Sequence, residues 1–201
     1  HPREYKTEIY NMPVFVYESL YLGLPTYFES SGRIPPPFGN QDGTNSVKLV
    51  ASRDLRAWTR VGDRTHFLPI SEMGQGGLDT GQVLAASHPI LHGDELWFYY
   101  TGVDVRYRPG EASNQRDWYH GAIHLAKLRR DGFVSLHAGA EPGLVETRAI
   151  TFDGTRLFVN ATVTGTLSVE LVALDGVTVL EGWEKGRCTP VVGDPLKAEV
   201  S

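Results

Sequence analysis

The chain has 201 residues, of which 41% are hydrophobic and 21% charged, and its formal net charge is -5. These values are typical of a globular protein that buries a real core as one domain or a domain and a half. The negative charge, without a basic stripe, gives no reason to expect a nucleic-acid partner. No apolar run approaches the roughly 20 residues that span a bilayer, so no membrane partner is expected either.

The single cysteine, Cys188, rules out an internal disulfide and a zinc site made of thiolates, and we interpret it as a buried small residue. The 7 histidines show no metal-ligand spacing. We therefore expect no metal and no cofactor. Neither a secretory signal nor an initial Met is visible, so we interpret the first residues as an addition or a processing point. We expect a soluble chain whose compartment the sequence does not identify.

The first half of the chain predicts four strands separated by turn signals and one long loop. Glu18-Ser19 is a turn candidate between two apolar runs, and Asp54 lies in a second turn. Residues 29–45 are rich in Ser, Gly, Pro, Asn and Asp and contain three consecutive prolines, which favours a long loop over a central strand. The strands are predicted at residues 9–17, 20–28, 47–52 and 58–61.

The second half begins at Asp79-Thr80-Gly81-Gln82 and repeats this layout. Pro89-Ile90-Leu91 corresponds to Pro13-Val14-Phe15, and the Gly93-Asp94 turn signal predicts a hairpin, as Glu18-Ser19 does in the first half. The repeat distance is roughly 71–77 residues, and each four-stranded unit matches one blade of a β-propeller. The four strands are predicted at residues 83–91, 96–100, 122–128 and 133–136, the first of them made of the runs 83–86 and 89–91.

The pattern of predicted strands and turns changes near residue 140. We place a domain boundary there, between propeller blades, 1–140, and a β-sandwich-like segment, 141–201. Evenly spaced short strands with Gly turns are typical of a sandwich. A last strand candidate, 197–200, has no visible partner. The strands are predicted at 147–152, 156–163, 167–174 and 177–180, with hairpin turns at Asp153-Gly154, Thr164-Gly165 and Asp175-Gly176. The predicted fold class is all-β, a partial β-propeller of about two four-stranded blades followed by β-sandwich-like strands.

Three stretches carry a resemblance to a known family. Ser52-Arg53-Asp54-Leu55-Arg56-Ala57-Trp58 resembles the Ser-x-Asp-x-x-x-Trp turn of five-bladed β-propeller glycoside hydrolases, the clan of invertase, levanase and arabinanase. Asp79-Thr80-Gly81-Gln82, with residues 93–100, is similar to a later blade of that clan. Residues 128–136 resemble the end of the propeller in an invertase-like branch, in which a β-sandwich follows. The resemblance covers most of the chain and implies a carbohydrate-active protein.

Two motifs of that clan have no counterpart in this chain. The Trp-Met-Asn-Asp-Pro type motif of the first blade, which carries the usual nucleophile, is absent, and so is an Arg-Asp-Pro motif. Residues 1–140 also make about two blades where the clan has five. The resemblance therefore implies the C-terminal portion of such a protein, or a derivative of one, with weak or no hydrolytic activity alone.

Hydrolysis of a glycosidic bond needs two carboxylates, about 5 Å apart for retention and roughly 6.5–9.5 Å apart for inversion. The innermost strands of a propeller begin near its axis, so one acid per blade can supply the pair. Glu8 and Asp79 occupy equivalent places in the two repeats, and we assign them as candidate catalytic residues. The alternative is that Asp79 caps a turn or a strand entry and that Glu8 belongs to a ragged N-terminus.

A polar loop between two predicted strands of the second repeat combines arginine, histidine and aromatic residues, and such loops often contact substrates. We assign Arg106, Trp118 and His120 as candidate substrate contacts, together with Gln82 in the Asp79 motif. The alternative is an ordinary solvated loop.

Other polar and aromatic residues are predicted to be structural. Asp54 is expected to bond its own backbone two residues on. Trp97 and Tyr99 could stack on sugars, but aromatic residues at strand spacing are mostly core.

Two functions stay open at this point. The first is a carbohydrate-active, glycoside hydrolase-like protein, and the second is a non-catalytic glycan-binding or oligomer-forming module. Two blades leave unpaired strand edges, which can pair with another chain. A homo-oligomer formed through exposed strand edges is therefore expected.

Overall fold

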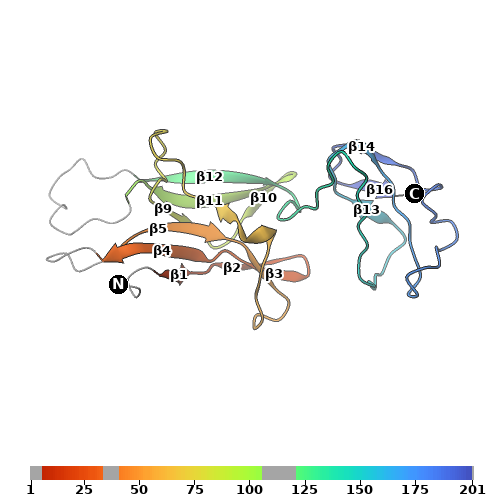
Figure 1. The fold of residues 1–201 in the computed structure, drawn as a ribbon, viewed down its shortest axis with the longest axis horizontal. Helices are drawn as coiled ribbons and strands as arrows, with labels where there is room; N and C mark the ends of the chain where they lie inside the picture. Colours follow the sequence, from red (N-terminus) through yellow and green to blue (C-terminus); the bar gives the residue numbers. More distant parts are fainter. Residues whose placement is uncertain (1–5, 34–40, 106–120, 201) are drawn as a thin grey trace. The chain divides into compact units, whose positions relative to one another are not determined.

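The computed structural model describes residues 6–33, 41–105 and 121–200. The chain divides into two compact units, His1–Ser135 and Leu136–Ser201. Strands dominate (Figure 1), and the described residues contain no α-helix, only a 3-10 turn at Gly62–Arg64. The all-β class predicted from the sequence is confirmed. Within the same residues, no helix is long and apolar enough to cross a membrane.

The first unit carries twelve strands in its described part. They are β1 (Thr7–Asn11), β2 (Val14–Tyr17), β3 (Leu20–Gly23), β4 (Thr26–Arg33), β5 (Gln41–Lys48), β6 (Val50–Ser52), β7 (Thr59–Arg60), β8 (His66–Leu68), β9 (Gln82–Ala85), β10 (Ile90–His92), β11 (Glu95–Val103) and β12 (Gly121–Arg129).

An eight-stranded sheet combines strands from both halves of the first unit. Its order is β1-β4-β5-β9-β11-β10, with β12 paired to β11 and β8 paired to β5, while β2-β3-β6-β7 form a separate four-stranded sheet. Over the described residues, neither sheet closes on itself. The expected division into two four-stranded blades is therefore not confirmed, because strands of the first repeat share one sheet with strands of the second.

The repeat found in the sequence corresponds to two equivalent hairpins in the structure. In the first, Tyr17 pairs with Leu20 across a two-residue turn, and in the second, His92 pairs with Glu95 in the same way. The first turn residue adopts a left-handed conformation in both cases, with φ 51° at Glu18 and φ 59° at Gly93. A left-handed first residue matches the twist of a tight hairpin, which is why Gly is favoured there.

The two repeats join where β5 meets β9. The pairing Asn45↔Gln82 is parallel, whereas the other strand pairs among the described residues are antiparallel. The backbone N–H of Asn45 donates to the carbonyl of Gly81 at 3.2 Å. This short parallel contact continues the sheet from one repeat into the next.

Strands occupy both ends of the loop predicted at residues 29–45. β4 continues to Arg33 and β5 starts at Gln41. A Cβ added to Gly43 would lie 2.6 Å from the carbonyl oxygen of Glu29, so glycine allows the two strands to approach there. Polar composition misled the prediction because an antiparallel hairpin tolerates polar residues on a solvated face. The three prolines lie outside the described residues.

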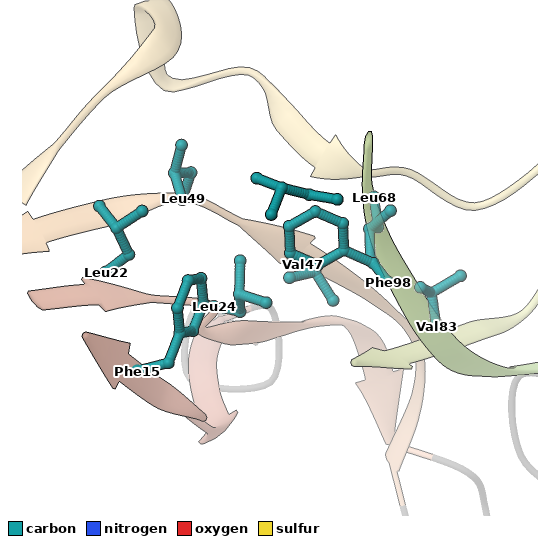
Figure 2. Close-up of a cluster of buried hydrophobic side chains, with 9 residues drawn as sticks. Phe15, Leu22, Leu24, Val47, Leu49, Leu68, Val83 and Phe98 are labelled. Carbon is teal, nitrogen blue, oxygen red and sulfur yellow. The ribbon is translucent and has the colours of Figure 1, made fainter. Parts of the chain in front are cut away.

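The core of the first unit lies between strands of the two repeats (Figure 2). Phe98 of β11 packs edge-on against Phe67, with ring centroids 5.2 Å apart, and against Phe15 of β2 at 6.5 Å. The buried apolar cluster consists of Phe15, Leu22, Leu24, Val47, Leu49, Leu68, Val83, Leu96 and Phe98. Because both repeats contribute side chains to this cluster, neither repeat buries its apolar face alone.

The strand β11 presents the opposite face from the one predicted. Leu96 and Phe98 are buried in the core, whereas Tyr99 remains 38% exposed and Trp97 is half-buried on the outer face. The prediction of Trp97 and Tyr99 as core residues was wrong. The run from Leu96 to Tyr100 is apolar throughout, so alternation could not indicate which face is buried.

The second unit has four short strands in its described part: β13 (Leu157–Val159), β14 (Val163–Leu167), β15 (Val191–Gly193) and β16 (Ala198–Val200). β13 pairs with β16 and β14 with β15, so the last strand has a partner, contrary to expectation. The hairpins predicted at Asp153-Gly154 and Thr164-Gly165 are wrong, since β13 pairs with β16 and Gly165 lies inside β14. At Asp175-Gly176 the predicted turn is present, with a bridge between Val172 and Val179. Cys188 is buried, as predicted.

Candidate functional site

Asp79 is a buried carboxylate of the first unit and lies three residues before β9. The residue is only 5% exposed. The hydroxyl of Tyr100, on β11, donates to Oδ2 of Asp79 at 2.9 Å. Ser71 also hydrogen bonds to this carboxylate through its side chain, and its backbone N–H donates to the carbonyl of Asp79 at 3.2 Å. The loop before β9 is thereby fastened to the sheet through Asp79.

The carboxyl group of Asp79 stays ionised despite its burial. Burial is the largest single influence and raises its pKa, because it disfavours the charged form. The hydrogen bonds from Ser71 and Tyr100, together with the charge of His124, outweigh burial and lower the pKa below its ordinary value. The reciprocal effect appears at Tyr100, where burial and then the hydrogen bond to Asp79 raise the phenol pKa to about 12. Asp79 is therefore an anchored anion at neutral pH.

His124 completes this group from the neighbouring strand β12. It pairs across the sheet with Tyr100, and the two rings stack at a centroid distance of 5.0 Å with 15° between their planes. The Nε2 atom of His124 is buried and has no hydrogen-bond partner among the described residues. A buried polar atom of this kind normally has a partner, so Nε2 of His124 could form a hydrogen bond with a ligand.

Glycine at position 102 makes room for these side chains. A Cβ on Gly102 would lie 2.4 Å from the Cβ of Asp79 and 2.7 Å from Nε2 of His124. Real Cβ contacts are not this short, so a larger residue would displace one of the two. We call Ser71, Asp79, Tyr100 and His124 the Asp79 cluster.

Gln82 lies close in sequence to Asp79 but on the other face of the sheet. The side chain of Asp79 lies against Gly102, and Gly102 pairs with Val83. Val83 therefore shares the face of the Asp79 cluster. Since successive strand residues face opposite sides, Gln82 points away from the Asp79 cluster. Its amide accepts a hydrogen bond from Asn45 at 3.1 Å and donates to the carbonyl of Val105 at 3.1 Å. Gln82 thus reinforces the junction between the two repeats.

Glu8 is not brought to Asp79. It lies on β1, at the end of the strand order, and β4 and β5 separate it from β9, which corresponds to about 14 Å across the sheet. Its side chain is 50% exposed and pairs with Lys6 at 2.8 Å. Residues paired across neighbouring strands face the same side of a sheet. Glu8 therefore shares a face with Gln82, through the pairings Glu8↔Phe28, Phe28↔Asn45 and Asn45↔Gln82. The expectation that the leading acids of the two repeats share one hollow therefore has no support in this geometry.

The remaining predicted residues divide into two groups. Arg106, Trp118 and His120 lie outside the described residues. Asp54 is described, and its Oδ1 accepts the backbone N–H groups of Arg56 at 2.8 Å and of the next residue, so the predicted structural turn is confirmed. Within the described ranges, no three His, Cys, Asp or Glu side chains are grouped so that they could hold a metal ion.

Sequence reasoning missed Ser71 and His124 as members of the site. His124 could have been found from the hairpin register, because the residue opposite Tyr100 on the next strand is fixed once β11 and β12 are paired. No comparable signal marks Ser71, which lies in an irregular loop. In comparisons with known proteins, no protein-family model, curated protein or solved structure matches the chain.

Proposed function

We propose that the chain is a carbohydrate-active, glycoside hydrolase-like protein that binds a neutral sugar at the Asp79 cluster and hydrolyses glycosides weakly or not at all by itself. We also propose that the first unit is a portion of a β-propeller and the second a β-sandwich-like segment. The observation that carries it is the anchored Asp79 anion beside the buried Nε2 of His124, which lacks a partner among the described residues. The resemblance of Ser52–Trp58 and Asp79–Gln82 to propeller glycosidases supports the choice of a sugar.

The chemistry of the Asp79 cluster suits a hydroxyl-rich ligand. An ionised carboxylate accepts hydrogen bonds only, whereas an imidazole nitrogen donates when it carries a proton and accepts when it does not. A sugar hydroxyl does both, so it can donate to Asp79 and complete the hydrogen bonding of His124. Hydrogen bonds to an ionised group are among the strongest available to a neutral ligand. An anionic ligand would be repelled by the carboxylate.

The same geometry argues against a complete hydrolase in this chain alone. A glycosidase uses one carboxyl group with a raised pKa as the acid and a second as nucleophile or base. The lowered pKa of Asp79 suits only the second role. Glu8, the expected partner, is exposed and lies on the opposite face. Binding with little or no turnover is the function that these two residues support.

The test is oligosaccharide binding by calorimetry, with fragments of arabinan, fructan and xylan as ligands. Loss of a hydrogen bond to a charged group weakens binding roughly 10- to 100-fold, so Asp79→Asn and His124→Gln should each reduce affinity by that order. Asp94→Asn, in the exposed turn before β11, is the matched control and should bind like the wild type. Thermal unfolding of all three variants checks that the fold is kept.

Two outcomes would overturn the proposal. The first is that no oligosaccharide binds to the wild-type chain, and the second is that Asp79→Asn and Asp94→Asn behave alike. Release of reducing sugar at ordinary enzyme rates would contradict the statement on weak activity. Lost turnover in Asp79→Asn with retained binding would then assign Asp79 to catalysis.

A further inference from the structure

The strand β12 forms an open edge of the eight-stranded sheet. It pairs with β11 without interruption from Gly121 to Arg129. On its other side β11 is already occupied by β9 and β10 (Figure 1). Among the described residues no strand pairs with the second edge of β12. Backbone N–H and C=O groups of alternate residues along this edge therefore point outward, as a template for another strand.

The outer face of β12 is apolar over its middle. Ile123 is 71% exposed and Leu125 is 38% exposed, and Leu125 pairs across the sheet with Tyr99, which is equally exposed. Exposed apolar side chains beside an open edge favour burial against a partner. The register of β12 on β11 shows no bulge, and the strand contains no proline. Two usual means of protecting an edge strand, a bulge and a proline, are therefore absent from this described strand.

The charges of β12 lie toward its C-terminal end, where Lys127 is already engaged. Its ammonium group lies 4.8 Å from the ring centroid of Trp97 and 3.4 Å from a carboxylate oxygen of Glu95. The side chain is thereby held along the outer face of its own sheet. Lys127 is thus not extended across the open edge.

We propose that two copies of this chain pair antiparallel through β12, about a two-fold axis at Leu125. This register uses all nine residues of the strand, because Leu125 is its central residue. It places Leu125 opposite its own copy and Ile123 opposite Lys127 of the second copy. Two leucines and two isoleucines then gather on one face, and Lys127 does not meet another Lys127. A self-complementary strand of this kind gives a closed, symmetric dimer.

The register can be tested with a pair of opposite charges at one position. The proposed dimer contains two symmetric pairs of residue 123 with Lys127 of the other copy. In Ile123→Lys, each pair brings two ammonium groups together, and directly opposed like charges are destabilising. In Ile123→Glu, the new carboxylate faces Lys127 instead. Sedimentation equilibrium of the full chain should therefore show a dimer for the wild type, a dissociation constant raised at least about tenfold for Ile123→Lys, and a retained dimer for Ile123→Glu.

A cysteine variant tests directly whether the two-fold axis lies at Leu125. Leu125→Cys places two thiols opposite each other, so mild oxidation should link two chains, whereas Leu91→Cys on β10, a residue 55% exposed, should not link them. The native Cys188 is buried and does not contribute. A monomeric wild-type mass at tens of micromolar, equal effects of the two charges at position 123, or equal crosslinking of the two cysteine variants would each overturn the proposal. Agreement of all three measurements with expectation would establish it.

Discussion

The hydroxyl of Tyr17 donates a hydrogen bond to the carboxylate of Asp131 and accepts the backbone N–H of the same residue at 3.2 Å. Tyr17 is the last residue of β2, and Asp131 lies in the turn after β12, 114 positions along the chain. The ring of Tyr17 also packs edge-on against Phe133 at 4.8 Å. Burial and then the bond to Asp131 raise the pKa of Tyr17. One phenol therefore fastens the beginning of the first unit to its end.

Replacing Tyr17 with Phe tests this connection. The ring contact with Phe133 is kept and the two hydrogen bonds are lost. Because the contact with Asp131 is exposed and therefore screened by solvent, the free energy of unfolding should fall by only about 0.5–1.5 kcal/mol. The matched control is Tyr21→Phe on β3, because the Tyr21 side chain makes no hydrogen bond or ring contact within the described part of the chain. Urea unfolding followed by tryptophan fluorescence measures both. Equal stability of the two variants would show that the Tyr17–Asp131 contact contributes nothing.

Tyr100→Phe removes the hydroxyl that anchors Asp79. Hydrogen bonds to charged groups contribute about 1.5–3 kcal/mol, and we expect a loss of unfolding free energy in this range. Tyr99→Phe is the control, since Tyr99 is the adjacent residue on the outer face of the same strand. Asp79 should also titrate at a higher pH in Tyr100→Phe, which carboxyl NMR shifts would detect. An unchanged Asp79 titration would contradict the described geometry.

Stability at high pH should depend on Tyr100. Its pKa is about 12 in the folded chain against 10.0 for a free phenol, so the fold favours the neutral form. The stabilisation is fully present below pH 10 and is lost as the pH rises toward 12. We expect the unfolding free energy of the wild type to fall more steeply in this window than that of Tyr100→Phe. Parallel curves for the two proteins would rule out the raised pKa.

Gly102→Ala should disturb the Asp79 cluster without changing any polar group. The added methyl would meet Asp79 and His124 at distances no real contact shows, and overpacking of this kind costs about 1–3 kcal/mol. Gly165→Ala on β14 is the control, because a Cβ there meets nothing within 4 Å among the described residues. Thermal unfolding should separate the two variants. If sugar binding is also measured, Gly102→Ala should lose it and Gly165→Ala should keep it.

The sequence predicted most strands of the first unit because their local signals are strong. The turns at Glu18-Ser19 and Gly93-Asp94 fix two hairpins, and both are present. Asp54 was recognised as a turn residue because Asp bonds nearby backbone N–H groups wherever the chain turns. These predictions need only a few neighbouring residues. Contacts between distant strands needed information that local patterns do not hold.

The candidate site shows which features local sequence patterns could not predict. Asp79 was found from its place before a strand, but its partners Tyr100 and Ser71 depend on how the strands and loops pack. The pairing of Glu8 with Asp79 assumed that equivalent places in the repeats converge. In the eight-stranded sheet, β1 and β9 are instead separated by β4 and β5. The order of the strands in this sheet, which no local pattern encodes, keeps Glu8 away from Asp79.

The parallel contact between Asn45 and Gln82 has a consequence for the order of folding. The hairpins β2-β3 and β10-β11 each close a two-residue turn, and hairpins form within about 1–10 μs. The Asn45–Gln82 contact spans 37 residues and the Tyr17–Asp131 contact 114, so each has to overcome the entropy of a larger loop. The two hairpins should therefore nucleate independently and early, and docking of one repeat on the other should set the folding rate.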